Sequence, residues 1–468
     1  MALDLKLRVT ESGGRAGPKG AEPVPARNRT MQVRLERDWL RYREASGTDV
    51  LLDFARRRRI VLDEAARTYR EESLFATVGF RHMELANREL GRSVIAAGKG
   101  DTAELEPVMA EHHLSALDKS RGRTIDSETP WSGGLRGFFR SVIGGSTRSD
   151  ISVVSERGHT VFATAAGRRL FSFSDEGTDA PPEQVRQFVQ FLRYVYQGHP
   201  LVLERLASGD RIPRDIHYFA RQPFESPAHE VSLRVHAVDV VPDVALPLIG
   251  LRRVLRPHED SPVNASIERV LLGEVPDNQE VVTRRMAEAK QSLQAGRGLE
   301  GTLALMELSL ETDVSPSELG ALLQQETDVH VRRLREALTQ PPRNEAEARA
   351  VVATYVELRG PAGNKAHVLN TFQASTHRAL QEDEEARGLL LDAIEVNPFL
   401  AGAYKDLGDI YLSEYATGDA WMCWEAARKL APDHRLLKDV NEWEATLVAD
   451  HPEYFEGGRA LGFDTRLH

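Results

Sequence analysis

The sequence contains a single cysteine, Cys423, among 468 residues. One thiol cannot form an intramolecular disulfide, nor can it supply a metal site built from several cysteines. Both a cytosolic protein and a periplasmic protein without disulfides have this composition. Aromatic residues make up only 7% of the chain. We therefore expect cores built from aliphatic side chains.

Long apolar runs are also missing. No stretch reaches the length of a membrane span, so we expect no transmembrane segment. The first twenty residues carry a charge at every second or third position where a signal peptide requires apolar residues. A signal peptide removed earlier would leave the same sequence, so that question stays open.

Motifs that carry chemistry are absent as well. There is no G-x-S-x-G, H-E-x-x-H, P-loop or G-x-G-x-x-G pattern. His112 and His113 point about 100° apart if they lie on a helix, and no third ligand is evident. His229 and His236 have odd spacing on a strand pattern, so they point to opposite faces. We predict no catalytic residue, no metal and no cofactor.

An excess of positive charge is lacking too. The net charge is −11, and from Asn278 onward 20 Lys and Arg face 32 Asp and Glu. Phosphate recognition needs a basic face, so we expect no nucleic-acid partner. The run Arg56 to Arg59 is either a solvated turn between two strands or a contact to a phosphate or lipid headgroup, and we favour the turn.

The N-terminal half contains strand patterns. Leu3, Leu5, Leu7 and Val9 alternate with polar residues, which predicts a strand. Residues 11–28 are rich in Gly, Pro and charge, which predicts a loop or flexible arm and makes residues 1–30 a separate segment.

Residues 31–260 show two series of short β-prone runs, at 31–73 and 151–174. Turns about ten residues apart predict antiparallel meanders. A helix at 183–197 has an apolar face that we expect to lie across the sheet. A further strand at 229–241 points Val231, Leu233, Val235 and Ala237 inward. This part is therefore α+β, in one domain or two.

One stretch of this part has a family resemblance. The sequence "VLLDF", a basic turn and "RIVLDEAARTYRE" resembles the meander of periplasmic lipoprotein-carrier-like domains, over about residues 31–75. Leu62, Asp63 and Tyr69 occupy the matching positions. The resemblance implies a curved sheet over an apolar cleft, a periplasmic location and a lipid or other apolar ligand.

From residue 265 the pattern changes to amphipathic helices joined by short turns, which predicts an all-α solenoid over 265–468. Residues 401–434 resemble a tetratricopeptide repeat. Every signature position is filled, by the following residues: Tyr404, Leu407, Gly408, Tyr411, Ala420, Trp424, Ala427 and Pro432.

In that family, ligands lie against the first helices of successive repeats. The resemblance places Lys405, Asp409, Leu412 and Ser413 on this partner-binding face. Lys405 and Asp409 are also spaced i, i+4, so a pair that supports the helix is an equally good interpretation.

Two functional interpretations follow, and we favour the first. The chain is a non-catalytic interaction or scaffold protein of the bacterial cell envelope, on the periplasmic side or else in the cytoplasm, with a protein or peptide partner at its helical repeats. The alternative is a periplasmic carrier that holds an apolar ligand in its sheet. An enzyme on an unrecognised α+β fold is a second alternative, which would require polar groups converging in that half.

Overall fold

The computed structural model describes residues 1–12, 26–97, 151–164, 169–196, 200–220, 229–312, 314 and 328–456. These residues divide into two compact units. The first contains the described residues up to Arg253 and those from Thr446 onward, and the second contains Val254–Ala445. The helical unit is therefore inserted into the chain of the first unit.

The first unit is built on one 12-stranded sheet with the order β14-β6-β5-β4-β3-β2-β1-β13-β12-β9-β8-β7. All pairings are antiparallel except that of β14 with β6. Its strands are β1 (Ala2–Ser12), β2 (Arg27–Leu35), β3 (Trp39–Glu44), β4 (Asp49–Asp53), β5 (Arg58–Asp63), β6 (Thr68–Ser73), β7 (Ile151–Glu156), β8 (His159–Thr164), β9 (Arg169–Ser174), β12 (Asp215–Ala220), β13 (His229–Val241) and β14 (Arg252–Arg253). A separate ribbon pairs β10 (Gly177–Asp179) with β11 (Arg211–Pro213).

The predicted alternation of β1 is confirmed. Leu5, Leu7 and Val9 are at most 1% exposed, while the residues between them face outward. The basic run is divided: Arg56 and Arg57 lie in the turn between β4 and β5, whereas Arg58 and Arg59 begin β5. Arg59 pairs with Glu72 of β6 at 3.1 Å. The predicted turn thus holds for the first half of the run only.

Strand β13 joins the two meanders into one sheet, because it pairs with β1 on one side and β12 on the other. Val231, Leu233 and Val235 point inward as predicted. The register shifts after Val235, so that His236 has no partner on β1. This bulge breaks the alternation and leaves Ala237 only half-buried, where strict alternation predicted it inside.

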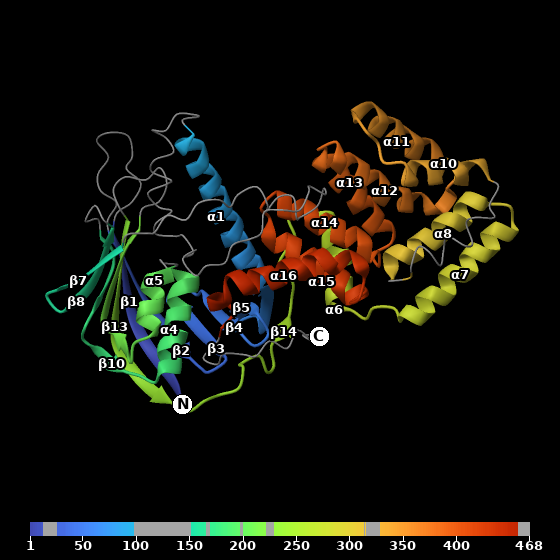
Figure 1. Cartoon of the computed structure of the whole chain (residues 1–468). Helices are drawn as coiled ribbons and strands as arrows, with labels where there is room; N and C mark the ends of the chain where they lie inside the picture. Colours follow the sequence, from blue (N-terminus) through green and yellow to red (C-terminus); the bar gives the residue numbers. More distant parts are fainter. Residues whose placement is uncertain are drawn as a thin grey trace. The chain divides into compact units, whose positions relative to one another are not determined.

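Among the described residues, three helices accompany the sheet: α1 (Leu74–Ala96), α4 (Pro182–Val195) and α5 (Pro200–Ala207). Helix α4 packs on β2 and β3, as predicted, with α5 beside it (Figure 1). Phe188, Phe191 and Leu192 on α4 have no exposed surface. Phe191 meets the ring of Tyr42 on β3 with centroids 5.9 Å apart.

Additional side chains pack against the strands β3 to β5. Trp39, Leu51, Ile60 and Leu62 form a second apolar cluster. Four half-buried residues cover it: Tyr69 on β6, and Leu246, Leu248 and Leu251 from the segment that precedes β14. Both faces of β4 are consequently buried, and its burial pattern shows no alternation.

The second unit is helical. Its helices are α6 (Asn264–Leu272), α7 (Asn278–Gln294), α8 (Gly298–Glu311), α10 (Val329–Thr339), α11 (Glu345–Leu358), α12 (Ala366–Ala379), α13 (Asp383–Val396), α14 (Ala401–Ser413) and α15 (Thr417–Leu430). Helix α16 (Lys438–Asp450) begins in this unit and ends in the first. Helices α10 to α15 pack in chain order as three pairs, α10/α11, α12/α13 and α14/α15.

The predicted fold class is confirmed: an α+β part with an antiparallel sheet comes first, and an all-α part follows. None of the described helices combines the length and apolarity needed for a membrane span. Most of the predicted arm at residues 11–28 and the pair His112 and His113 lie outside the described residues.

Candidate functional site

The hairpin α14/α15 packs as the signature positions predict. A Cβ on Gly408 would lie 2.5 Å from Trp424 Nε1 and 2.9 Å from the carbonyl oxygen of Ala420. Only glycine therefore permits this approach of the two helices. Tyr404 and Trp424 have no exposed surface, and Trp424 Nε1 donates to the carbonyl of Lys405 at 3.2 Å.

The four predicted partner-binding residues differ in exposure. Lys405 is 9% exposed, Asp409 5% and Leu412 1%, and only Ser413 is exposed. A partner can touch Ser413 directly, whereas the other three are covered by the chain itself. Their role in binding stays a prediction.

Lys405 and Asp409 form the i, i+4 pair, with Nζ and Oδ2 2.8 Å apart. Burial disfavours the charged amine, but Asp409 and Asp406 outweigh it and raise the pKa of Lys405. Arg378 on α12 also reaches Asp409, at 3.4 Å. The pair therefore supports its own helix, links it to α12 and is buried.

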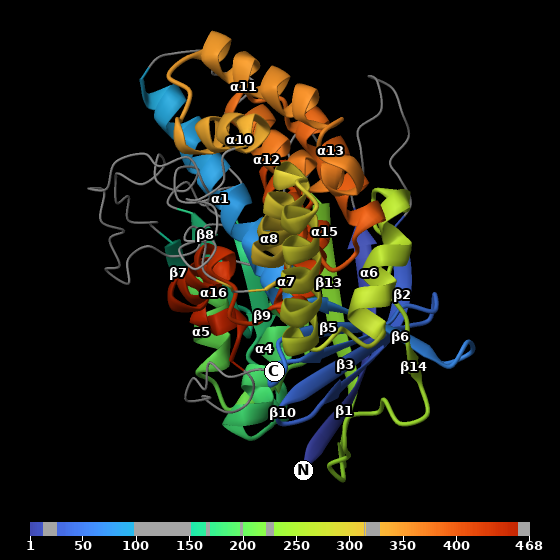
Figure 2. The same cartoon turned by 90° about the vertical axis from the view of Figure 1, so that its right-hand side faces the viewer.

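Helix α8 lies across the first helices of the three successive pairs. It packs against α10, α12 and α14, while α7 packs along its other side (Figure 2). Twelve of its residues are buried, including Leu303, Leu305 and Leu308. The face formed by these first helices thus already holds a helix of this chain.

The C-terminal end of α8 meets three complementary groups. A Cβ on Gly402 of α14 would lie 2.8 Å from Leu310 Cδ2, so the glycine provides the space for this leucine. His434 Nε2 donates to the carbonyl of Ser309 at 3.0 Å. Arg435 approaches the carbonyl of Val314 at 3.4 Å. Donors of this kind satisfy the unpaired carbonyls at a helix C-terminus.

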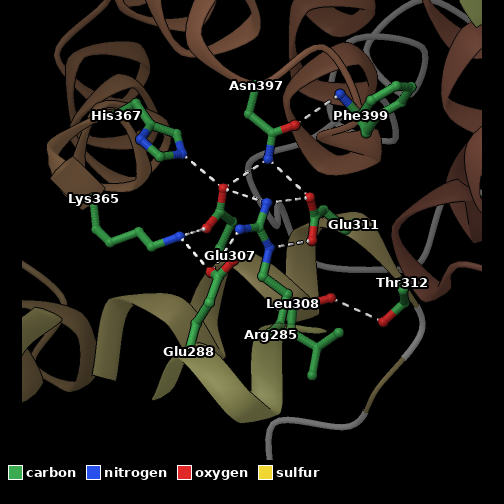
Figure 3. Close-up of polar contacts among 10 residues, drawn as sticks. All are labelled: Arg285, Glu288, Glu307, Leu308, Glu311, Thr312, Lys365, His367, Asn397 and Phe399. Atoms are coloured by element: carbon green, nitrogen blue, oxygen red, sulfur yellow. Dashed lines mark hydrogen bonds and ion pairs between the residues drawn. The ribbon is translucent and has the colours of Figure 1, made fainter. Parts of the chain in front are cut away.

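Two carboxylates of α8, on Glu307 and Glu311, form the centre of a buried polar cluster (Figure 3). Lys365 Nζ lies 2.7 Å from Glu307 Oε2, and His367 Nε2 donates to Glu307 Oε1 at 2.8 Å. Asn397 donates to both carboxylates, at 2.7 and 2.8 Å.

Helix α7 supplies the remaining cation, Arg285. Its guanidinium makes two parallel hydrogen bonds to Glu311, of 2.8 and 2.7 Å, and approaches Glu307 at 2.9 Å. It also pairs with Glu288 on its own helix at 2.8 Å. Such forked pairs fix geometry as well as charge.

The cluster holds Glu307 in its charged form. Burial alone would favour the neutral acid, but the hydrogen bond from His367 and the charges of Arg285 and Lys365 lower the pKa of Glu307 to about 2. A carboxylate poised for proton transfer near neutral pH needs the opposite shift. The cluster is therefore suited to holding α8 and not to acid–base catalysis.

Sequence reasoning missed this cluster, whose members are spread from Arg285 to Asn397. One signal was available: the segment 303–311 places Glu307 and Glu311 four residues apart among leucines. Acids on a buried helical face require partners. Nothing in the pattern names those partners.

A second buried cluster joins Cys423, His258 and Asp419, the residue types of a thiol nucleophile with its base. His258 Nδ1 accepts a hydrogen bond from the main-chain N–H of Asp260 at 3.0 Å, so in the neutral ring Nε2 carries the proton. That nitrogen, 3.6 Å from Cys423 Sγ, cannot take the thiol proton. Burial and the nearby Asp419 raise the pKa of Cys423, and neither side chain is accessible. This arrangement does not activate the thiol.

Buried polar side chains of the first unit mostly bind main chain. Gln184, Gln187 and Gln190 recur every three residues on α4, and their amides donate to carbonyls of Met1, Arg37 and Glu453 at 2.9, 2.7 and 2.6 Å. They do not converge on a cavity. Within the described ranges, no three His, Cys, Asp or Glu side chains are placed to hold a metal ion.

Comparison with known proteins adds no assignment, because no family model and no curated protein matches this sequence.

Proposed function

We propose that this chain is a non-catalytic interaction or scaffold protein that binds a protein or peptide partner through tetratricopeptide-like helical repeats. The observation that carries the proposal is helix α8, seated across the first helices α10, α12 and α14. The repeats of this chain thus already hold a helix on the face that binds ligands in the family. The filled signature positions of α14 and α15 support the same interpretation.

The alternative of an apolar carrier receives less support. A carrier sheet needs an open apolar face, but Phe188, Phe191 and Leu192 of α4 occupy the face at β2 and β3. We place the protein in the bacterial cell envelope, on the periplasmic side, because of the resemblance over residues 31–75. The cytoplasm is the alternative location.

Native mass spectrometry with organic extraction separates the two functions. We expect the full chain to have the mass of the polypeptide alone. A lipid that co-purifies and is lost on denaturation would replace the scaffold proposal by the carrier.

The interaction itself is tested with a partner isolated on the full chain and then purified separately. We expect isothermal titration calorimetry to give a stoichiometric complex that Ser413→Glu weakens, because Ser413 is exposed on α14. The matched control is Thr178→Glu, an exposed position on β10 of the first unit. Weakening by the control alone would move the binding site to the first unit and contradict the proposal.

A further inference from the structure

Helix α8 and the surface on which it packs are complementary in charge, in shape and in the hydrogen bonds at the C-terminal end of the helix. We call that surface the α8-binding surface and define it by Lys365, His367, Asn397, Gly402 and His434. We propose that α8 is a built-in competitor for this surface. The partner that replaces it is an amphipathic helix with two carboxylates four residues apart beside a leucine. The inference rests on the proposed function, since it concerns the same repeats.

The α8-binding surface has hydrogen-bond donors for two carboxylates that lie four residues apart on a helix. Lys365 and His367 donate to Glu307, and Asn397 bridges Glu307 and Glu311. All three donors are at most 8% exposed. A helix without acids at these two positions would leave buried donors unpaired, which costs about 1–3 kcal/mol for each group. The α8-binding surface therefore discriminates strongly against helices that lack these two carboxylates.

The hairpin α7/α8 carries its own cation for these acids. Arg285 of α7 bonds Glu311 and approaches Glu307, and Lys365 also reaches Glu288 of α7. When the hairpin leaves, Glu307 and Glu311 keep Arg285 as a partner. The α8-binding surface keeps Lys365 and His367 without an acid. Departure therefore costs the hairpin little in unpaired charge and leaves a surface that selects an acidic helix.

One glycine weakens helix α8. Gly301 is the fourth residue of the helix, and a glycine in a helix interior costs about 1 kcal/mol relative to alanine. Gly301 is needed where it is, since a Cβ there would lie 2.7 Å from Leu293 Cγ on α7. A partner helix that does not pack on α7 has no such requirement. It can carry better helix formers on that side and thus compete with α8.

A reversible lock tests the inference in the full chain. A Cβ at position 402 would lie 3.7 Å from the Cα of Leu310, within reach of a disulfide. The double variant Leu310→Cys/Gly402→Cys removes the leucine that a Cβ at 402 would strike. The natural Cys423 is buried and does not interfere. Oxidation ties α8 to α14, and reduction frees it in the same molecule.

The probe is a fluorescein-labelled synthetic peptide with the sequence of residues 297–314, followed by fluorescence anisotropy. We expect the oxidised double variant to bind it at least about tenfold more weakly than the reduced form, because the competent state is no longer populated. A peptide with glutamine at the positions of Glu307 and Glu311 should bind neither form. Equal binding in both redox states, or equal binding of both peptides, overturns the inference.

A second variant loosens α8 without touching the α8-binding surface. In the full chain, Glu307→Gln/Glu311→Gln should bind the unmodified peptide about tenfold more tightly than the natural sequence does. Circular dichroism establishes that the variant is folded. If the folded variant does not bind, the competitor role is wrong. If the oxidised lock still binds the purified partner unchanged, the interaction function stands and only its link to α8 fails.

Discussion

Helices α4 and α8 each fill a surface that their own unit builds, and both bury apolar side chains, but α8 is in addition held by buried ion pairs. Helix α4 presents Phe188 and Phe191 to the sheet, and its glutamines donate to main-chain carbonyls. Helix α8 buries Leu303, Leu305 and Leu308, and polar and charged groups also hold it at two set positions. Apolar contact is non-directional, whereas buried ion pairs accept only a matching partner. Helix α4 therefore completes a fold mainly by apolar packing, whereas the surface under α8 also selects charge, which is the basis of the recognition role that we propose for it.

The largest expected effect concerns α4. Phe191→Ala removes a fully buried ring that meets Tyr42, and we expect it to lower the free energy of unfolding by about 3–5 kcal/mol in urea titrations. The control is Phe80→Ala on α1, where the side chain is 46% exposed and the change should stay within about 0.5 kcal/mol. Similar losses in both would mean that α4 does not complete the fold.

The next effect concerns the charge cluster. Glu307→Gln leaves Lys365 buried beside a neutral amide, and we expect a loss of about 3 kcal/mol. Hydrogen exchange should show the loss first in α7 and α8. The control, Glu357→Gln, breaks an exposed pair with Arg333 and should change stability by less than about 1 kcal/mol. If the amides of α8 in the Gln variant keep the hydrogen-exchange protection of the natural chain, the cluster does not hold this helix.

Acid should affect the two units differently. Burial, with His82 and Arg81 nearby, lowers the pKa of His451 to about 3 in the first unit. The unfolded chain titrates near 6.5, so between these values the unfolded state binds more protons and stability falls as the pH falls. We expect about 2 kcal/mol to be lost by pH 4.5. Glu307, with a pKa of about 2, keeps its contacts there.

The check is urea unfolding at pH 7 and 4.5, comparing the natural chain with His451→Gln. The variant should lose less stability on acidification. The same loss in both would assign the pH dependence to other groups.

The smallest expected effect concerns the hairpin α14/α15. Gly408→Ala places a methyl group against Trp424 and should cost about 1–2 kcal/mol in thermal unfolding. Gly388 on α13 has no atom within 4 Å of a Cβ. Gly388→Ala should therefore stabilise by about 0.5–1 kcal/mol, and a matching loss at both positions would disprove the close approach.

The sequence predicted those elements that have one face toward solvent and the other toward the core. The period-two pattern of β1 and the apolar face of α4 were readable because one face is wet and the other dry. The glycines and aromatics of α14 and α15 could be identified because the close packing of two helices in a hairpin requires small and large residues at set positions in the sequence. These patterns were sufficient for the fold class.

The remainder depends on pairing between distant segments. The bulge at His236 is created by the register of β13 on β1, and neither strand shows it alone. The three glutamines of α4 are buried although they lie outside the apolar face that the pattern predicts. Their burial depends on carbonyls from three separate segments, which the helix sequence does not reveal. The donors around Glu307 come from residues 285, 365, 367 and 397. Local periodicity contains none of this information.

The return of the chain to the first unit has a consequence for its synthesis. Tyr454 and Phe455 are buried in the first unit, where Tyr194 donates to the carbonyl of Tyr454 at 2.7 Å. These residues leave the ribosome after the entire helical unit. A nascent chain can therefore form the sheet and the helices early, but the first unit gains these contacts only after the whole helical unit has been translated.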